Sequence, residues 1–405
     1  MPNPTIYAIA TMDTKGEEID FIAARIRAAG ARALTVDVGT KDPATTRPDI
    51  PRETVASHST NVLGKSDRGQ AVAAMADALT AFLRAEHAAG KISGVIGVGG
   101  SGGTALIAPA LRALPVGLPK VLVSTVASGN VAPYVGATDI AMIYSVTDVA
   151  GLNRVSRVVL GNAARAIAGM VSTATTTTAA AQDKPAVGLT MFGVTTPCVT
   201  AVRKTLETNH DLDCLTFHAT GTGGQAMEKL VESGLIDGGI IDVTTTEVAD
   251  LVAGGIFAAL PTRFDPILQK QIPFVLSLGA MDMVNFGARD TVPAKYGDRK
   301  FHIHNPQITL MRTTPEENKQ CARFIASKLN RATSPWTLLI PEQGISALDA
   351  KGQPFWDPNA NTALFTELES TLETNSSRQI RRLPLHINDP QFAQELVQSF
   401  LNLRA

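Results

Sequence analysis

Residues 95–104 read Val-Ile-Gly-Val-Gly-Gly-Ser-Gly-Gly-Thr. The apolar start predicts a buried strand, and the glycines that follow predict a tight turn into a helix from about Thr104. Such a turn exposes backbone N–H groups at the positive end of a helix dipole, where phosphate oxygens bind well. We therefore expect phosphate or another anion here. The alternative is a turn that only packs the helix on the strand.

Short apolar runs alternate with amphipathic segments on both sides of this turn, as is typical of βα units with a largely parallel sheet. Strands are expected at Thr5–Ala10, Ala33–Val38, Gly94–Val98, Lys120–Ser124, Ala186–Thr190, Leu212–His218, Gly239–Val243, Phe274–Leu278, Phe301–His304 and Thr337–Ile340. Helices are expected at Glu17–Ala29, Gln70–His87, Thr104–Ala113, Val199–Thr208, Gly224–Ser233, Glu247–Ala259, Pro315–Leu329 and Gln391–Leu403.

A low-complexity run, TATTTTAAAQDKP at 173–185, separates two such series and has no apolar face. It predicts a linker between a first domain at 1–172 and a second at 186–405. The first strand of each half ends in Thr-Met, and each half carries a glycine loop. The two halves therefore resemble versions of one unit, although their glycine loops follow the third and the second strand respectively.

The composition excludes several classes of protein. The 405 residues carry 36 basic and 37 acidic side chains, a net charge of −1, so neither nucleic acid nor a membrane surface is an expected partner. Three cysteines without metal-site spacing fit a reducing compartment. No signal peptide and no membrane-spanning run can be recognised, so we expect a soluble cytoplasmic protein.

Other residues of the first half are placed to join the anion site. Lys15 follows the first strand at an expected helix start, where a cation opposes the helix dipole unless an anion lies between them. Thr40 ends the second strand, and Arg68 precedes a long helix as a candidate phosphate clamp. Thr125 and Asn130 follow the fourth strand, at the edge where open α/β sheets bind ligands. A capping box of Thr14 and Glu17 is also expected at the first helix.

The second glycine loop lies in FHATGTGGQA at 217–226. Gly221, Gly223 and Ala226 fit the dinucleotide pattern G-x-G-x-x-A, and Asp242 lies 21 residues after Gly221, where an acid would hold a ribose. The first loop also contains a G-x-G-x-x-G match, but no acid follows it between positions 104 and 138. On spacing, NAD thus fits the second loop better. An anion or small-ligand loop and a structural turn are the alternatives.

Polar residues also gather at strand ends of the second half. His302, His304, Glu342 and Asp242 are acid/base candidates by location only, in a pocket for a small-molecule ligand. The two histidines share one face of a strand and could hold a metal with either carboxylate, but no third ligand is fixed, so we predict no metal site. Thr244 and Glu247 fit a second capping box.

A series of longer motifs supports a family resemblance. They are ATMDTKGEE (10–18), VDVGT (36–40), DRGQA (67–71), GVGGSGGT (97–104), FHATGTGG (217–224), DVTTTEVAD (242–250), GAMDMVNFG (279–287), HIHNPQITLMRTTPEEN (302–318) and PEQGISALDA (341–350). In this order they resemble the two-domain ATP-binding family that includes the N-terminal region of the tomato mosaic virus resistance protein. The resemblance spans residue 5 to the late 360s.

The resemblance implies two Rossmann-like α/β domains with helices on both faces of their sheets, and a homodimer. It also implies an adenine-nucleotide site in the first domain, made by Lys15, Thr40, Arg68, Gly99, Gly100, Ser101, Gly102, Gly103 and Thr104, with Thr125 and Asn130 as neighbours. In the plant relative, a barrel domain similar to phosphoenolpyruvate-hydrolase-like enzymes follows. We therefore expect a separate barrel protein as a partner of this chain.

Three functions are compatible with these observations. The leading one is a Mg-ATP-binding protein that activates a small carboxylate or carbonyl substrate by phosphoryl or adenylyl transfer, with ATP and Mg²⁺ as cofactors. The second is a non-catalytic, nucleotide-responsive regulatory or interaction protein. The third is an NAD-dependent oxidoreductase that uses the loop at Gly221.

Overall fold

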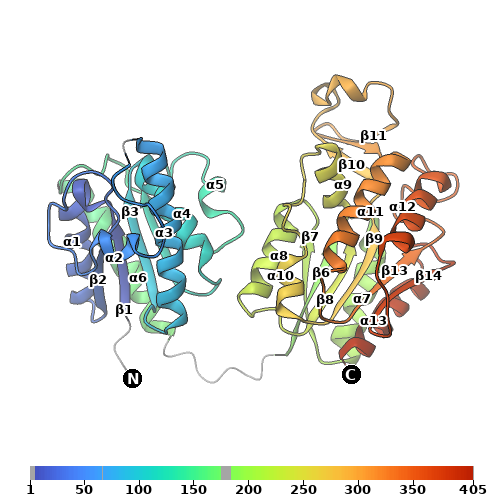
Figure 1. The fold of residues 1–405 in the computed structure, drawn as a ribbon, viewed down its shortest axis with the longest axis horizontal. Helices are drawn as coiled ribbons and strands as arrows, with labels where there is room; N and C mark the ends of the chain where they lie inside the picture. The colour runs from blue at the N-terminus through green and yellow to red at the C-terminus, as the bar shows by residue number, and fades with distance from the viewer. Residues whose placement is uncertain (1–4, 66, 175–183, 405) are drawn as a thin grey trace. The chain divides into compact units, whose positions relative to one another are not determined.

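A computed structural model describes residues 5–65, 67–174 and 184–404 of the chain (Figure 1). The chain divides into two compact units, residues 1–181 (unit 1) and 182–405 (unit 2). Most of the predicted linker at 173–185 lies outside the described residues. Each unit has its own sheet and its own apolar core, and each is described separately below.

The described part of unit 1 forms a parallel sheet in the order β2-β1-β3-β4-β5. Its strands are β1 (Thr5–Ala10), β2 (Arg32–Asp37), β3 (Gly94–Gly99), β4 (Lys120–Ser124) and β5 (Ala141–Tyr144). Because β2 and β3 pair with opposite sides of β1, the strand order reverses at the carboxyl ends of β1 and β3. A crevice at such a switch point is where open α/β sheets bind ligands.

Helices cover both faces of this sheet. They are α1 (Met12–Ala28), α2 (Arg52–Ala56), α3 (Arg68–Ala88), α4 (Ser101–Ala113), α5 (Ala132–Val135) and α6 (Arg154–Ala174). One apolar core packs α1 and α6 against side chains such as Ile6 and Ala8 of β1. The other packs α3 and α4 against Tyr7 and Ile9, which alternate with them along the same strand.

The described part of unit 2 repeats this arrangement. Its parallel sheet has the order β14-β13-β9-β8-β6-β7. When this order is followed from β7, the second strand of the unit comes first, then the first strand and then the third, as in the order β2-β1-β3 of unit 1. The strands are β6 (Ala186–Met191), β7 (Asp213–His218), β8 (Gly239–Thr244), β9 (Phe274–Gly279), β13 (Trp336–Pro341) and β14 (Arg378–Leu383). The switch point therefore lies between β6 and β8. The shared strand order supports duplication of one unit.

Unit 2 adds a small antiparallel sheet of β10 (Met283–Phe286), β12 (Ile308–Arg312) and β11 (Phe301–Asn305). Its helices are α7 (Thr196–Asn209), α8 (Thr222–Glu232), α9 (Thr246–Ala253), α10 (Asp265–Lys270), α11 (Pro315–Leu329), α12 (Pro358–Thr371) and α13 (Pro390–Arg404). Helices α7 and α13 cover one face of the parallel sheet, whereas α8, α9, α11 and α12 pack in the core on the other. Short 3₁₀ turns lie at Gly193–Thr195, Arg289–Thr291 and Ala294–Tyr296.

The structure confirms an α/β protein with mainly parallel sheets flanked by helices, consistent with two Rossmann-like domains. Two expected helix starts were wrong. Helix α1 begins at Met12, so Thr14 lies inside its first turn and cannot be the N-cap of a capping box. Helix α9 begins at Thr246, so the capping box at Thr244 is also absent. The Glu247 side chain instead accepts a hydrogen bond from the N–H of Gly221.

Two adjacent glycines of the first loop have different structural requirements. A Cβ at Gly99 would lie 2.9 Å from the Cα of Gly103, because the backbone of α4 turns directly over the end of β3. A Cβ at Gly100 would meet only the Thr125 hydroxyl, at 3.8 Å. Gly99 is therefore required for packing, whereas Gly100 lies beside open space.

We predict that Gly99→Ala destabilises unit 1 by about 1–3 kcal/mol, the usual cost of overpacking against backbone. The control is Gly100→Ala, which we expect to leave stability within about 0.5 kcal/mol of the wild type. Urea unfolding followed by circular dichroism measures both. Equal stabilities of the two variants would contradict this account of the turn.

Candidate anion-binding site

A cavity of about 430 Å³ lies at the carboxyl ends of β1 and β3 in unit 1, at the switch point of the sheet. It brings together four parts of the chain that the sequence had singled out. Its lining residues are Thr11, Asp13, Thr14, Lys15, Thr40, Lys41, Arg68, Val72, Gly100, Ser101, Gly102, Gly103 and Leu106. The structure therefore places Lys15, Thr40, Arg68 and the glycine turn around one space, as expected.

The glycine turn presents unpaired N–H groups to this cavity. Gly100 is the N-cap of α4 and, having no side chain, gives no side-chain cap. No acceptor among the described residues bonds the N–H groups of Ser101, Gly102 and Gly103. These groups lie at the positive end of the dipole of a 13-residue helix. The turn can thus donate several hydrogen bonds to one anion.

Three cations face the same cavity. Lys15 lies at a kink inside α1, with φ −128° and ψ 23°, and Lys41 follows the second strand. Arg68 opens α3 after Asp67, which caps the helix by accepting from the Gln70 N–H at 2.8 Å. Within the described ranges, no ion pair involves Lys15, Lys41 or Arg68. With the Asp13 carboxylate in the same lining, the described residues around the cavity keep a net positive charge that an anion could neutralise.

The buried carboxylate of Asp37 fixes the position of two of these segments. It accepts hydrogen bonds from the N–H of Met12 at 3.0 Å and from the N–H of Gly39 at 2.7 Å. It thereby ties the start of α1 to the loop that carries Lys41. Burial raises the pKa of Asp37, whereas the two N–H donors act in the opposite direction.

Four predicted residues lie outside the cavity lining. Gly99 packs under α4, and the buried hydroxyl of Thr104 bonds the Ser124 hydroxyl at 2.6 Å. Thr125 lies beside Gly100, and the Asn130 side chain accepts from the Ala132 N–H at 3.1 Å. These residues shape the turn and the neighbouring loop, but do not line the space. Their proposed contact with a nucleotide stays a prediction.

The sequence reasoning missed several lining residues, of which Lys41 and Asp13 matter most. Lys41 directly follows Thr40, and Asp13 directly follows the first strand end, so both positions could have been inferred from the strand-end rule. Val72 and Leu106 give the cavity an apolar wall. As core-facing helical residues, they carry no separate signal in the sequence.

Unit 2 has a buried ionic cluster near the carboxyl end of β8, beside the corresponding switch point. Arg263 is 2% exposed and contacts three carboxylates, those of Glu228 at 2.7 Å, Asp242 at 2.6 Å and Glu247 at 3.1 Å. The carboxylate of Glu247 also accepts from the N–H groups of Gly221 at 2.7 Å and Gly224 at 3.2 Å. The second glycine loop is therefore bonded by the protein itself.

This cluster removes the basis for an NAD site at the second loop. Asp242 is fully buried, and its other oxygen accepts from the Thr190 hydroxyl at 2.6 Å, so it cannot reach a ribose. A Cβ at Gly223 would overlap the carbonyl oxygen of His218. The glycine pattern here is explained by close packing and by the Glu247 contact.

The other candidates of unit 2 have separate partners. His302 and His304 lie on β11 of the antiparallel sheet, where the His302 ring packs edge-on against Phe355 with centroids 6.3 Å apart. Glu342 follows β13 and pairs with Arg382 at 2.8 Å. Within the described residues, no three His, Cys, Asp or Glu side chains are grouped to hold a metal. The structure therefore does not assemble these candidates into one site.

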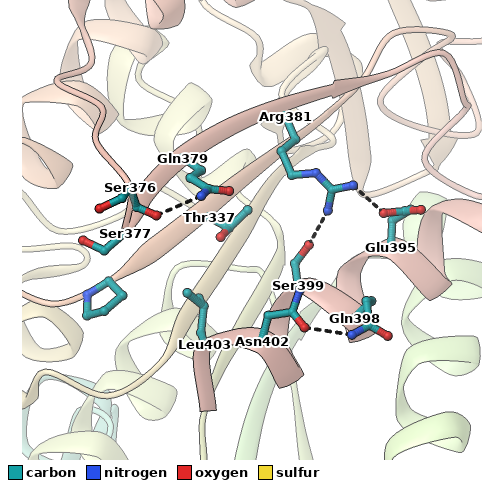
Figure 2. Close-up of a pocket in the computed structure, with 11 residues that line it drawn as sticks. Thr337, Ser376, Ser377, Gln379, Arg381, Glu395, Gln398, Ser399, Asn402 and Leu403 are labelled. Carbon is teal, nitrogen blue, oxygen red and sulfur yellow. Dashed lines mark hydrogen bonds and ion pairs between the residues drawn. The ribbon is translucent and has the colours of Figure 1, made fainter. Parts of the chain in front are cut away.

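A further cavity, of about 530 Å³, lies at the amino ends of β13 and β14 beside α13 (Figure 2). Its lining is mostly hydroxyl and amide side chains. Its charged pair, Arg381 and Glu395, is joined at 2.6 Å, and Arg381 also donates to the Ser399 hydroxyl at 2.8 Å. Because it lies opposite the carboxyl ends of the strands, it is not the expected ligand site of this fold.

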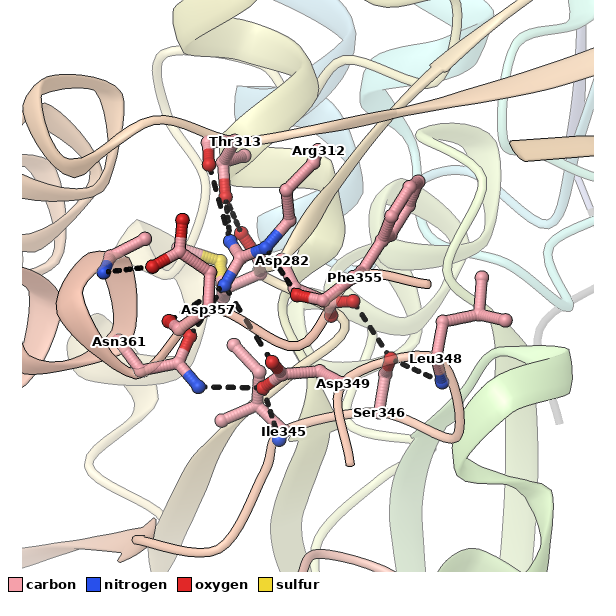
Figure 3. Close-up of polar contacts among 12 residues, drawn as sticks. Asp282, Arg312, Thr313, Ile345, Ser346, Leu348, Asp349, Phe355, Asp357 and Asn361 are labelled. Carbon is pink, nitrogen blue, oxygen red and sulfur yellow. Dashed lines mark hydrogen bonds and ion pairs between the residues drawn. The ribbon is translucent and has the colours of Figure 1, made fainter. Parts of the chain in front are cut away.

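A second buried polar cluster joins the loops that follow β9 and β13 (Figure 3). Arg312 donates to the Phe355 carbonyl at 2.8 Å and to Asn361 at 2.8 Å, and its guanidinium lies 3.6 Å from Asp349. Asp282 accepts from the Ser346 hydroxyl at 2.8 Å. One oxygen of Asp282 and one of Asp349 are buried with no hydrogen-bond partner in the described chain.

Burial, with the nearby Asp349 carboxylate, raises the pKa of Asp282 to about 7. Between about pH 4 and 7 the folded protein therefore keeps a proton that the unfolded chain loses, and stability falls as the pH rises. Asp250 contributes with the same sign, since burial also raises its pKa to about 7.

We predict that the free energy of unfolding of Asp282→Asn falls less than that of the wild type as the pH rises, by on the order of a few kcal/mol. Urea unfolding of wild type and variant at about pH 5 and about pH 7.5 measures how the free energy of unfolding of each protein changes with pH. The control is Asp298→Asn, which makes the same change on an exposed side chain. Parallel pH dependence of all three proteins would contradict a protonated Asp282.

Comparison with known proteins is consistent with this architecture. Residues 4–176 match the N-terminal domain and residues 184–404 the C-terminal domain of the uncharacterised protein family UPF0261. A UPF0261 protein of Rhizobium meliloti is 54% identical, over 98% of both chains, and one of Clostridium tetani is 43% identical, over 99% of both.

The ToMV resistance protein Tm-1(GCR237) of Solanum lycopersicum is 46% identical over 99% of this chain, which spans 56% of the plant protein. In the described part of the chain, no helix is sufficiently long and apolar to cross a membrane. The two family domains follow one another in this chain, the N-terminal domain at 4–176 and the C-terminal domain at 184–404. The chain belongs to the UPF0261 family.

Proposed function

We propose that unit 1 binds Mg-ATP in the cavity at the carboxyl ends of β1 and β3. One observation carries the proposal. N–H groups of the glycine turn and three cations, none of which has a partner among the described residues, face a single space at the switch point. A polyphosphate is the ligand class that satisfies both, because its oxygens accept from the N–H groups and its charge matches Lys15, Lys41 and Arg68.

Asp13 fits a role in holding the magnesium ion. It is the carboxylate among the described lining residues, and the hydrogen bonds it accepts from the Lys41 N–H and the Thr14 hydroxyl are long, at 3.4 Å and 3.5 Å. Its oxygens therefore have capacity left for a hard cation, which prefers oxygen ligands and usually binds through one or two carboxylates and phosphates. When bound, Mg²⁺ would neutralise phosphate charge.

The proposed reaction is activation of a small carboxylate or carbonyl substrate by phosphoryl or adenylyl transfer, together with a separate barrel-domain protein. Lys15 and Arg68 would orient the phosphates and stabilise the charge that develops on them, and the turn N–H groups would act in the same way. The family resemblance of the sequence is the basis for proposing a barrel partner and a homodimer. The composition of the sequence is the basis for proposing a cytoplasmic location.

A nucleotide-responsive regulatory protein is the second candidate function. Among the described residues lining the cavity, Asp13 is the only carboxylate, and there is no histidine or cysteine to act as a general base. Such a lining suits binding without chemistry. Measured ATP consumption in the presence of a barrel-domain protein would favour the enzyme over the regulator.

We predict that Gly100→Asp weakens binding of Mg-ATP at least tenfold, or about 1.4 kcal/mol, because it places a carboxylate beside the phosphates. Asp is a favourable N-cap, so the variant should keep the stability of α4. Isothermal titration calorimetry with Mg-ATP, AMP and NAD measures binding.

The control is Gly100→Ala, which adds the Cβ without the charge and should bind Mg-ATP nearly as the wild type does. Binding of Mg-ATP to the wild type with unchanged affinity in Gly100→Asp would place the nucleotide elsewhere. No Mg-ATP binding by the wild type would refute the proposal.

A further inference from the structure

The cavity of about 530 Å³ in unit 2 lies between one helix and two strands, and we call it the α13 cavity (Figure 2). Thr337 of β13 pairs in register with Gln379 of β14, and both side chains line the cavity. The residues that line it from α13 follow the spacing i, i+3, i+4, i+7 and i+8, so they share one helix face. They are Glu395, Gln398, Ser399, Asn402 and Leu403.

The neighbouring face of α13 is apolar, as expected where a helix covers a sheet. Phe392, Leu396 and Phe400 of this face pack in the core with Leu339, which lies two positions after Thr337 on β13. At the α13 cavity this core gives way to hydroxyl and amide side chains around an open space. Apolar side chains could close such a space and add stability, so packing does not explain the polar lining.

Two buried hydroxyl groups form the base of the cavity. Thr337 is 5% exposed and Ser399 is 4% exposed. Within the described ranges, the Thr337 hydroxyl has no hydrogen-bond partner. The Ser399 hydroxyl accepts from Arg381 at 2.8 Å, but no described residue accepts its own proton. A buried hydroxyl without a partner costs free energy, so both groups point to a ligand that supplies the partner.

We propose that the α13 cavity binds a neutral polyhydroxylated molecule, a sugar or a polyol. The two charged side chains of the lining, Arg381 and Glu395, are joined at 2.6 Å and neutralise each other, so the lining favours an uncharged ligand. Each hydroxyl of such a ligand both donates and accepts hydrogen bonds. The volume lies within the range of small-molecule sites, about 300–1,000 Å³.

The exposed rim of the cavity offers both kinds of partner that a sugar hydroxyl needs. The Gln379 amide donates to the Ser376 carbonyl at 2.9 Å, which leaves the Gln379 side-chain oxygen as an acceptor. The Gln398 amide donates to the Asn402 side-chain oxygen at 2.8 Å, which leaves the Gln398 oxygen as an acceptor and the Asn402 amide as a donor. Leu403 adds an apolar surface for the C–H groups of a sugar ring.

Methyl NMR of the full chain, labelled at its leucine side chains, tests the proposal. The probes are D-glucose, maltose and D-mannitol, which present one ring, two rings and an open chain. Leu403 lines the cavity and reports on binding there, whereas Leu63 is an exposed residue of unit 1 and serves as the control. We expect at least one probe to shift the Leu403 resonance saturably and to leave that of Leu63 unchanged. No saturable shift with any of the three, or equal shifts of both leucines, would overturn the proposal.

A first variant removes the buried hydroxyl from the base of the cavity. Thr337→Val keeps the shape of the side chain, and we expect it to weaken binding of the probe by about fivefold or more. Because this hydroxyl has no partner in the described chain, the variant should be as stable as the wild type. The control is Thr366→Val, the same change at an exposed position of α12, which should leave binding unchanged. Binding by Thr337→Val as tight as that of the wild type would contradict the site.

A second variant does not alter a buried residue. Asn402→Trp places a large ring at the exposed rim and should abolish the saturable shift of Leu403 by obstructing the cavity. A shift that persists in this variant would place the sugar elsewhere and refute the proposal. These experiments contain no nucleotide, so their failure leaves the proposal for unit 1 intact, and the reverse also holds.

Discussion

The N–H groups at the start of a helix have no partners within that helix, and this constraint shapes both halves of the protein. In each half a glycine loop places such groups at the carboxyl ends of a parallel sheet, after β3 at the switch point in unit 1 and after the edge strand β7 in unit 2. In unit 1 they face a cavity with Lys15, Lys41 and Arg68. In unit 2 the Glu247 carboxylate accepts from them. The N–H groups of unit 1 are thus left for a ligand, whereas those of unit 2 are bonded by a side chain of the protein itself.

The difference follows from where each glycine loop lies in the common topology. The loop of unit 1 follows β3, a central strand at the switch point, so its N–H groups open onto the crevice. The loop of unit 2 follows β7, at the edge of its sheet, and Glu247 reaches it from α9, which follows β8. Arg263, which also contacts Glu247, is buried beside it together with Asp242 and Glu228.

Much of the unit 1 site could be predicted from sequence because carboxyl ends of parallel strands meet at one edge. Lys15 and Thr40 each follow a strand end, Arg68 lies at the start of a long helix, and all three line the same cavity. The Arg263 cluster could not be predicted, since its partners lie 16 to 35 positions away and only the fold brings them together. The Thr244–Glu247 spacing fits a capping box, but Glu247 instead bonds the glycine loop, because tertiary contacts override the local pattern.

Hydrogen–deuterium exchange of the full chain, with and without Mg-ATP, tests most directly whether the two halves differ in this way. The account predicts slower exchange of the N–H groups at 101–103 when the nucleotide is bound, and no change at 221–224, where the protein already supplies the acceptor. Protection at 221–224 by the nucleotide, or its absence at 101–103, would contradict it.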